Sequence, residues 1–222
     1  MRKYIILTML FVFITTIILA QTPTKPNRVA GRHKIELEDP LGDVQENDGK
    51  PGKDVVRVAI TSDGENLNIV AELEKKVSYY LKDQLAGPVI ELHLNTDNNA
   101  KTGGVAFWGK NKIGFEYQLD VVACITYKSG GLACLGAAGK DIDGFISSYK
   151  LSKYEQDKKM PQAINSTLSS TQKEITGKEV EITVPYSEIG IKSGTRMMIS
   201  IRESDSTFDD ASYFPQVFFI VK

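Results

Sequence analysis

Hydrophobic and polar positions alternate with a period of two along much of this 222-residue chain. The alternation is clearest at residues 56–60, 67–73, 90–94, 180–184 and 197–201. Successive side chains of a strand point to opposite faces, so each stretch has one face to bury and one to hydrate. This pattern is typical of antiparallel sheets that share a core, and not of parallel βαβ units.

Turn-forming pairs separate these stretches, among them Asp63-Gly64, Gly87-Pro88, Gly103-Gly104 and Gly130-Gly131. No long stretch has a helical apolar period, although short helical turns are expected at 77–85 and 186–189. The chain contains neither an internal repeat nor a change of composition that would mark a second domain. We therefore predict an all-β fold, a two-sheet antiparallel β-sandwich (jelly-roll-like), as a single domain over residues 32–222.

The N-terminus has the features of a secretory signal peptide. Arg2 and Lys3 precede an apolar run over residues 4–19, and Ala20 offers a small residue for cleavage. We predict a signal peptide over residues 1–20, with an uncleaved membrane anchor as the alternative. Residues 21–31 contain two prolines and no periodicity, which predicts a flexible leader. The mature protein is then secreted, periplasmic or at the cell surface, with no membrane segment of its own.

The net charge argues against some classes of partner, and the cysteine content bears on the cellular compartment. Without Arg2 and Lys3 the chain has 25 basic and 28 acidic residues, which argues against nucleic acid or an anionic membrane as partner. Cys124 and Cys134 flank a plausible hairpin turn at residues 128–131, and positions equidistant from such a turn can lie opposite each other. Their spacing fits neither a Cys-x-x-Cys redox pair nor a zinc site. We predict a disulfide, and free buried thiols are the alternative.

Residues 95–104, which follow a predicted strand, have the composition of a Ca²⁺ loop. Asp97, Asn99 and the carbonyl of Lys101 stand at alternate positions and offer oxygen ligands. The loop is not an EF-hand, because that pattern needs Gly where Thr102 stands and Glu where Trp108 stands. The remaining ligands of a structural Ca²⁺ would come from Asp39, Asp43, Glu116 or Asp120. The alternative is a plain turn, because Asn and Asp tolerate turn geometry.

Three segments in this order resemble a known family. They are Asp-Pro-Leu-Gly-Asp at 39–43, the strand and loop at 91–104, and Glu-Val-Glu-Ile-Thr-Val-Pro-Tyr-Ser-Glu-Ile-Gly at 179–190. Together they resemble the family 9 carbohydrate-binding modules and the wider DOMON-like β-sandwich group. The resemblance implies a two-sheet sandwich, structural Ca²⁺, and sugar or haem binding among relatives. Sugar-binding relatives often use two Trp residues, and this chain has one.

A sugar site needs a flat aromatic ring beside polar groups. Trp108 is the first candidate ligand-binding residue, with a packing role as its alternative. Tyr79, Tyr80 and Phe208 are further candidates.

Enzyme signatures are absent from the sequence. It contains no G-x-S-x-G, H-E-x-x-H, P-loop or G-x-G-x-x-G motif, so we expect no catalytic activity. His93, one of two histidines, is expected to have a structural role, and a haem site is not expected. The sequence predicts a secreted, non-catalytic module with a structural calcium site that binds a glycan or cell-surface polysaccharide. The alternative is a structural or adhesive surface protein without sugar binding.

Overall fold

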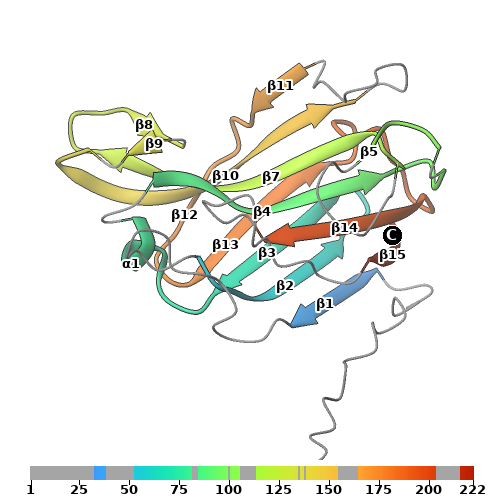
Figure 1. The fold of residues 1–222 in the computed structure, drawn as a ribbon, viewed down its shortest axis with the longest axis horizontal. Coiled ribbons are helices and arrows are strands. Elements are labelled where there is room, and N and C mark those ends of the chain that lie inside the picture. The colour runs from blue at the N-terminus through green and yellow to red at the C-terminus, as the bar shows by residue number, and fades with distance from the viewer. Residues whose placement is uncertain are drawn as a thin grey trace, which may run out of the picture.

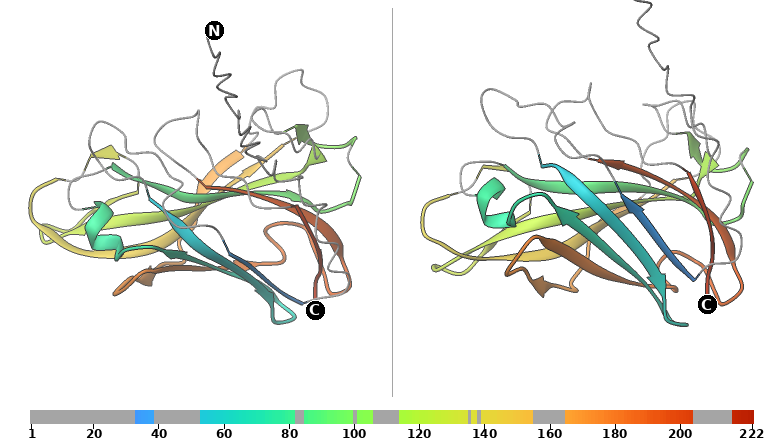
Figure 2. Two further views of the ribbon diagram at one scale, coloured as in Figure 1. Left: turned by 60° about the horizontal axis from the view of Figure 1, so that its bottom comes forward. Right: turned by 90° about the horizontal axis from the view of Figure 1, so that it is seen from below.

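Two antiparallel sheets pack face to face in a β-sandwich, which confirms the predicted fold class (Figures 1 and 2). The computed structural model describes residues 33–38, 53–81, 85–99, 101–105, 114–134, 136–137, 139–154, 165–203 and 216–222. The predicted signal peptide and leader lie outside these ranges.

The smaller sheet has the strand order β1-β2-β3-β13. These strands are β1 (Lys34–Glu38), β2 (Val55–Ser62), β3 (Asn66–Leu73) and β13 (Glu179–Pro185). β3 and β13 follow the predicted alternation. In β2 the pairing with β3 shifts between Val55 and Arg57, so Val55 is in the core and Val56 is only half-buried. The sequence pattern predicted Val56 on the buried side, and this irregularity of the ladder is the reason for the difference.

The larger sheet has the order β11-β10-β7-β4-β14-β15. Its strands are β11 (Asn165–Leu168), β10 (Ile142–Lys153), β7 (Tyr117–Tyr127), β4 (Leu85–Asn95), β14 (Arg196–Glu203) and β15 (Val217–Ile220). Three short strands join this path: β8 (Leu132–Ala133) pairs with β7, β9 (Gly136–Ala137) with β4, and β12 (Lys173–Glu174) with β10. All of these pairings are antiparallel.

A two-stranded sheet and a short helix complete the described fold. β5 (Gly104–Val105) pairs with β6 (Gly114–Phe115), and α1 (Val77–Leu81) lies within the segment where the sequence predicted a helical turn. Figure 1 shows α1 and β5 at opposite ends of the sandwich. None of the helical structure in the described ranges is long and apolar enough to cross a membrane.

Aliphatic side chains from both sheets form one core between the layers. Ile60 and Ile69 of the smaller sheet are fully buried there, as are Leu92 and Leu119 of the larger sheet. The core therefore fixes which side chains of each strand point outward, and this is what positions the polar groups described below.

Cys124 and Cys134 form a disulfide, as predicted. Ile125 pairs with Ala133 in the β7–β8 hairpin, so the next positions along the two strands are the cysteines. With Val122 they make a small apolar cluster separate from the main core. A disulfide indicates an oxidising, extracytoplasmic setting.

Candidate functional site

The outer face of the larger sheet is polar and yet buried. His93 is 6 % exposed, and Asp120 and Arg202 are each 7 % exposed. Charged side chains are almost never buried to this extent unless they are paired. The face is therefore unlike an ordinary hydrated sheet surface, and we consider it the candidate site.

Strand register arranges these side chains in two rows across β14, β4, β7 and β10. The first row is Arg202, Glu91, Asp120 and Lys150. The second row is Ser200, His93, Gln118 and Ser152. We call these eight residues the outer polar face. Residues directly opposite each other on neighbouring strands interact, so charges of both signs are neighbours here.

Glu91 is the centre of the first row. Its Oε1 lies 2.8 Å from Nε2 of His93, and its Oε2 lies 3.6 Å from Nη2 of Arg202. Burial alone would raise the pKa of the Glu91 carboxyl. The hydrogen bond from His93 and the electrostatic effects of His93 and Arg202 outweigh burial, so the pKa of the Glu91 carboxyl lies below its usual value. Glu91 is therefore held as a carboxylate.

The pKa of Asp120, in contrast to that of Glu91, is raised. Burial is the largest cause of its raised pKa, and the charge of Glu91 adds to it, against a lowering hydrogen bond from Gln118. Gln118 Nε2 donates to Asp120 Oδ1 at 2.9 Å, and Tyr154 Oη donates to Gln118 Oε1 at 2.8 Å. Burial also raises the pKa of Tyr154, with Asp120 and Glu91 as further causes. The environment therefore favours neutral forms of Asp120 and Tyr154.

Aromatic rings lie at one end of the outer polar face. The ring of Phe115, in β6, stacks on His93 with centroids 4.3 Å apart and planes inclined by 27°. The ring of Tyr154 meets Phe115 edge-on at 4.8 Å. Phe115 is 2 % exposed and Tyr154 is half-buried, so at this end of the face a sugar would have only the Tyr154 ring to pack on.

Residues 95–99 and 101–103 lie next to these rings, where β4 ends. Asp97 Oδ1 accepts from the Asn99 amide at 2.8 Å, and Asn99 Oδ1 accepts from the Lys101 amide at 3.1 Å. Glu116, just after Phe115, accepts from the Thr96 amide at 2.7 Å. These contacts agree with the plain turn that the sequence left open as an alternative to a Ca²⁺ loop.

One hydroxyl of this loop is surrounded by oxygen atoms. Thr102 Oγ1 lies 2.8 Å from Asp97 Oδ2, 2.8 Å from the Asn99 carbonyl and 3.0 Å from Glu116 Oε1. A hydroxyl carries one proton and can donate to only one of these three acceptors. The converging oxygens, two of them from carboxylates, are the ligand type that Ca²⁺ prefers. These oxygens are fewer than Ca²⁺ takes, and the described residues contain no group of three or more His, Cys, Asp or Glu that could hold a metal ion.

The other predicted ligands do not all gather at this loop. Glu116 does, whereas Asp120 belongs to the outer polar face and is bonded to Gln118. Asp39 and Asp43 lie outside the described residues.

The predicted aromatic residues also differ in position. Tyr79, in α1, is 50 % exposed, and Lys75 Nζ lies 4.8 Å from its ring centroid. Tyr80 is 1 % exposed and packs in the core, so its ring has no face for a ligand. Trp108 and Phe208 lie outside the described residues. The structure does not bring α1 to the loop, because the two are at opposite ends of the sandwich (Figure 1).

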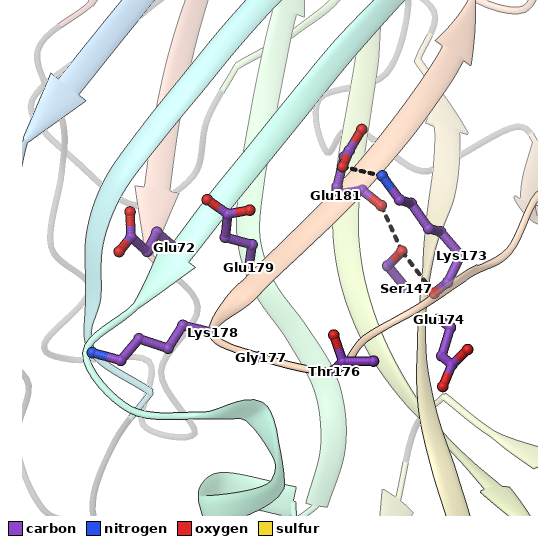
Figure 3. A pocket seen from close by; sticks show the side chains of 9 residues that line it. All are labelled: Glu72, Ser147, Lys173, Glu174, Thr176, Gly177, Lys178, Glu179 and Glu181. Atoms are coloured by element: carbon purple, nitrogen blue, oxygen red, sulfur yellow. Dashed lines mark hydrogen bonds and ion pairs between the residues drawn. The ribbon is translucent and has the colours of Figure 1, made fainter.

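A groove of about 410 Å³ runs between β13 and β12 (Figure 3). It is lined mainly by charged side chains, namely Glu72, Glu174, Glu179, Glu181, Lys173 and Lys178. Arg57 of β2 pairs with Glu72 at 2.8 Å and with Glu179 at 3.1 Å, and Lys173 pairs with Glu181. None of the described residues that line the groove is aromatic, so it is a weaker candidate for a sugar site than the outer polar face.

Glu91, Gln118 and Arg202 are not recognisable as site residues from the sequence. Each stands at the outward position of an alternating strand, where a polar residue is the ordinary choice for contact with water. These positions become neighbours across three strands only because of the strand register, which the local sequence does not reveal.

Comparison with known proteins adds no relative: no family model matches the chain, and neither a curated protein nor a solved structure is detectably similar to it.

Proposed function

We propose that this protein is a secreted, non-catalytic binding domain whose ligand is a glycan or a cell-surface polysaccharide. Support comes from the disulfide, from the sequence resemblance to family 9 carbohydrate-binding modules, and from the outer polar face. The site we propose is the outer polar face together with the half-buried ring of Tyr154.

The observation that carries the proposal is the combination of groups on this sheet face. Glu91, Gln118 and Arg202 offer acceptors and donors at fixed positions on three neighbouring strands. The half-buried ring of Tyr154 lies directly beside them, and the buried ring of Phe115 packs against it edge-on. Sugar hydroxyls need hydrogen-bond partners, and C–H faces of a pyranose pack on aromatic rings. Rigid strands hold such groups more precisely than loops do.

We further propose that Ca²⁺ organises the loop beside this site. Asp97 Oδ2, the Asn99 carbonyl and Glu116 Oε1 are the oxygens that would hold it. The bound ion would supply positive charge that fixes these oxygens around one point. Because Glu116 follows Phe115 directly, an ordered loop would also hold the ring that stacks on His93.

A structural or adhesive role without sugar binding is the second candidate. The observation that favours it is that Glu91, His93, Gln118 and Asp120 already bind one another within the chain. A sheet face whose polar side chains bind one another contributes to stability without any ligand.

A glycan array in the presence of Ca²⁺ tests the proposal, followed by affinities of matched carboxylate-to-amide variants. Glu91→Gln changes the outer polar face, and Glu179→Gln changes the groove in Figure 3. We expect at least a tenfold loss of affinity in Glu91→Gln and no change in Glu179→Gln. The reverse result would move the site to the groove. An array on which no glycan binds would leave the structural role.

A further inference from the structure

Arg202 is a buried guanidinium with one loose partner. Its side chain is 9 % exposed, and Nη2 lies 3.6 Å from Oε2 of Glu91, which is beyond hydrogen-bond distance. Its Nε atom is buried and has no hydrogen-bond partner among the residues that the structure describes. A guanidinium carries five N–H donors in a fixed fork and is always charged, so this one is far from satisfied by the described residues.

Glu91 cannot complete the environment of Arg202. The Oε1 atom of Glu91 is already 2.8 Å from His93 Nε2, which leaves only the distant Oε2 for the guanidinium. A buried charge that lacks acceptors is strongly unfavourable. An unsatisfied buried group of this kind in a native protein needs an explanation. One explanation is that a bound ligand supplies the missing acceptor.

The net charge of the first row also favours the binding of an anion. Arg202 and Lys150 are at its two ends, with Glu91 and Asp120 between them. Burial and the neighbouring Glu91 favour the neutral form of Asp120. When Asp120 is neutral, the row has an excess of positive charge, and the unsatisfied cation is Arg202.

We propose that Arg202 forms an anion subsite of the outer polar face, and that the bound glycan places a carboxylate there. The ligand class is therefore an acidic sugar of the uronic acid type. Guanidinium and carboxylate match as two parallel N–H···O bonds, which lysine cannot reproduce. The side chain is nearly closed to solvent, so the group that reaches it is small, as a carboxylate is. This inference rests on the proposed glycan-binding function.

Arginine Nε–H NMR signals of the whole mature protein test the subsite directly. Glucuronate is titrated against glucose and glucose 6-sulfate, with Ca²⁺ constant. We expect glucuronate to shift the Arg202 Nε–H signal and to raise the thermal midpoint, and glucose to do neither. In Arg202→Lys and Arg202→Met the rise in midpoint should be lost. Arg57→Met is the matched control, because Arg57 is satisfied by glutamates on the other sheet, and it should keep the response.

The outcomes separate this inference from the proposed function. If glucuronate has no effect on the Arg202 signal or the midpoint, the subsite is refuted, and a response to the sulfated sugar alone refutes the carboxylate. Equal affinity for acidic and neutral glycans also refutes the subsite while glycan binding stands. If no polysaccharide binds but glucuronate still acts through Arg202, the anion subsite stands and the glycan-binding function fails. Because the NMR signal is read in the wild-type protein, a variant that does not fold leaves the test intact.

Discussion

Oγ1 of Thr102 lies 3.0 Å from Oε1 of Glu116, across the loop that follows β4. Asp97 Oδ2 approaches the same hydroxyl from the other side at 2.8 Å. One oxygen of each carboxylate thus converges on the same hydroxyl proton, and only one of these two oxygens can accept it. A cation at this point would satisfy both, and the stability of the protein should then depend on that cation.

We expect Ca²⁺ to raise the thermal midpoint of the wild-type protein relative to EDTA. A ligand that binds only the native state at 100 times its Kd stabilises by about 2.7 kcal/mol. For a chain of this size that is roughly a 5–10 °C shift. Asp97→Asn and Glu116→Gln should lose most of the shift. Scanning calorimetry with Ca²⁺ and with EDTA measures it.

Asp143→Asn is the control for the calcium experiment, because it neutralises an exposed carboxylate of β10 away from the loop. It should respond to Ca²⁺ as the wild type does. Identical midpoints of the wild-type protein in Ca²⁺ and EDTA would contradict a Ca²⁺ site and leave the plain turn.

Asp120 should make the stability of the protein depend on pH. Burial raises its pKa in the folded state above the unfolded value of about 3.9. The folded state then binds more protons than the unfolded state. The contribution of Asp120 to stability is therefore fully present below the unfolded pKa and is lost as the pH rises through the folded pKa.

Asp120→Asn should remove this loss and keep the hydrogen bond from Gln118 Nε2, because the amide oxygen of Asn can accept it. We expect similar midpoints for the variant and wild type near pH 4, and a higher midpoint for the variant at pH 7. Thermal melts across this range measure the difference, with Asp143→Asn as an exposed reference. A wild type that is more stable than the variant at pH 7 would show that ionised Asp120 is favourable here.

Much of the fold could be predicted from local pattern. The alternation in β3 placed Leu67 and Ile69 in the core, and the symmetric spacing about a Gly-containing turn placed Cys124 opposite Cys134. Both inferences needed only the two-residue repeat of a strand and the geometry of one hairpin. In β2 the same rule put Val56 on the wrong side, because a shift of register is not visible in composition.

The candidate site could be predicted only in part, because it depends on contacts between distant strands. The loop near Asp97 is local and was found from the sequence, whereas Glu116 joined it as one of several candidates. Arg202 is opposite Glu91 only because β14 pairs with β4 in one particular register. A shift of one residue would place Arg202 on the core side, and nothing in the local sequence excludes that pairing.

The disulfide should contribute strongly to stability. Replacing both cysteines, in the double variant Cys124→Ala/Cys134→Ala, should lower the free energy of unfolding by about 2–3 kcal/mol, as expected for a short closed loop. Guanidinium denaturation measures this loss. A reductant should destabilise the wild-type protein but not the double variant. Alkylation of two thiols in the non-reduced wild-type protein would contradict the disulfide.

Ser147 should hold the two sheets together beside the groove in Figure 3. Its side chain, 1 % exposed, donates to the carbonyl of Glu181 in β13, and the Lys173 carbonyl of β12 lies 3.3 Å away. Ser147→Ala leaves a carbonyl without its donor, which should cost about 1–3 kcal/mol of unfolding free energy in urea denaturation. Ser129→Ala, in an exposed turn, should stay within about 0.5 kcal/mol of wild type. Equal stabilities of the two variants would show that Ser147 does not connect the sheets.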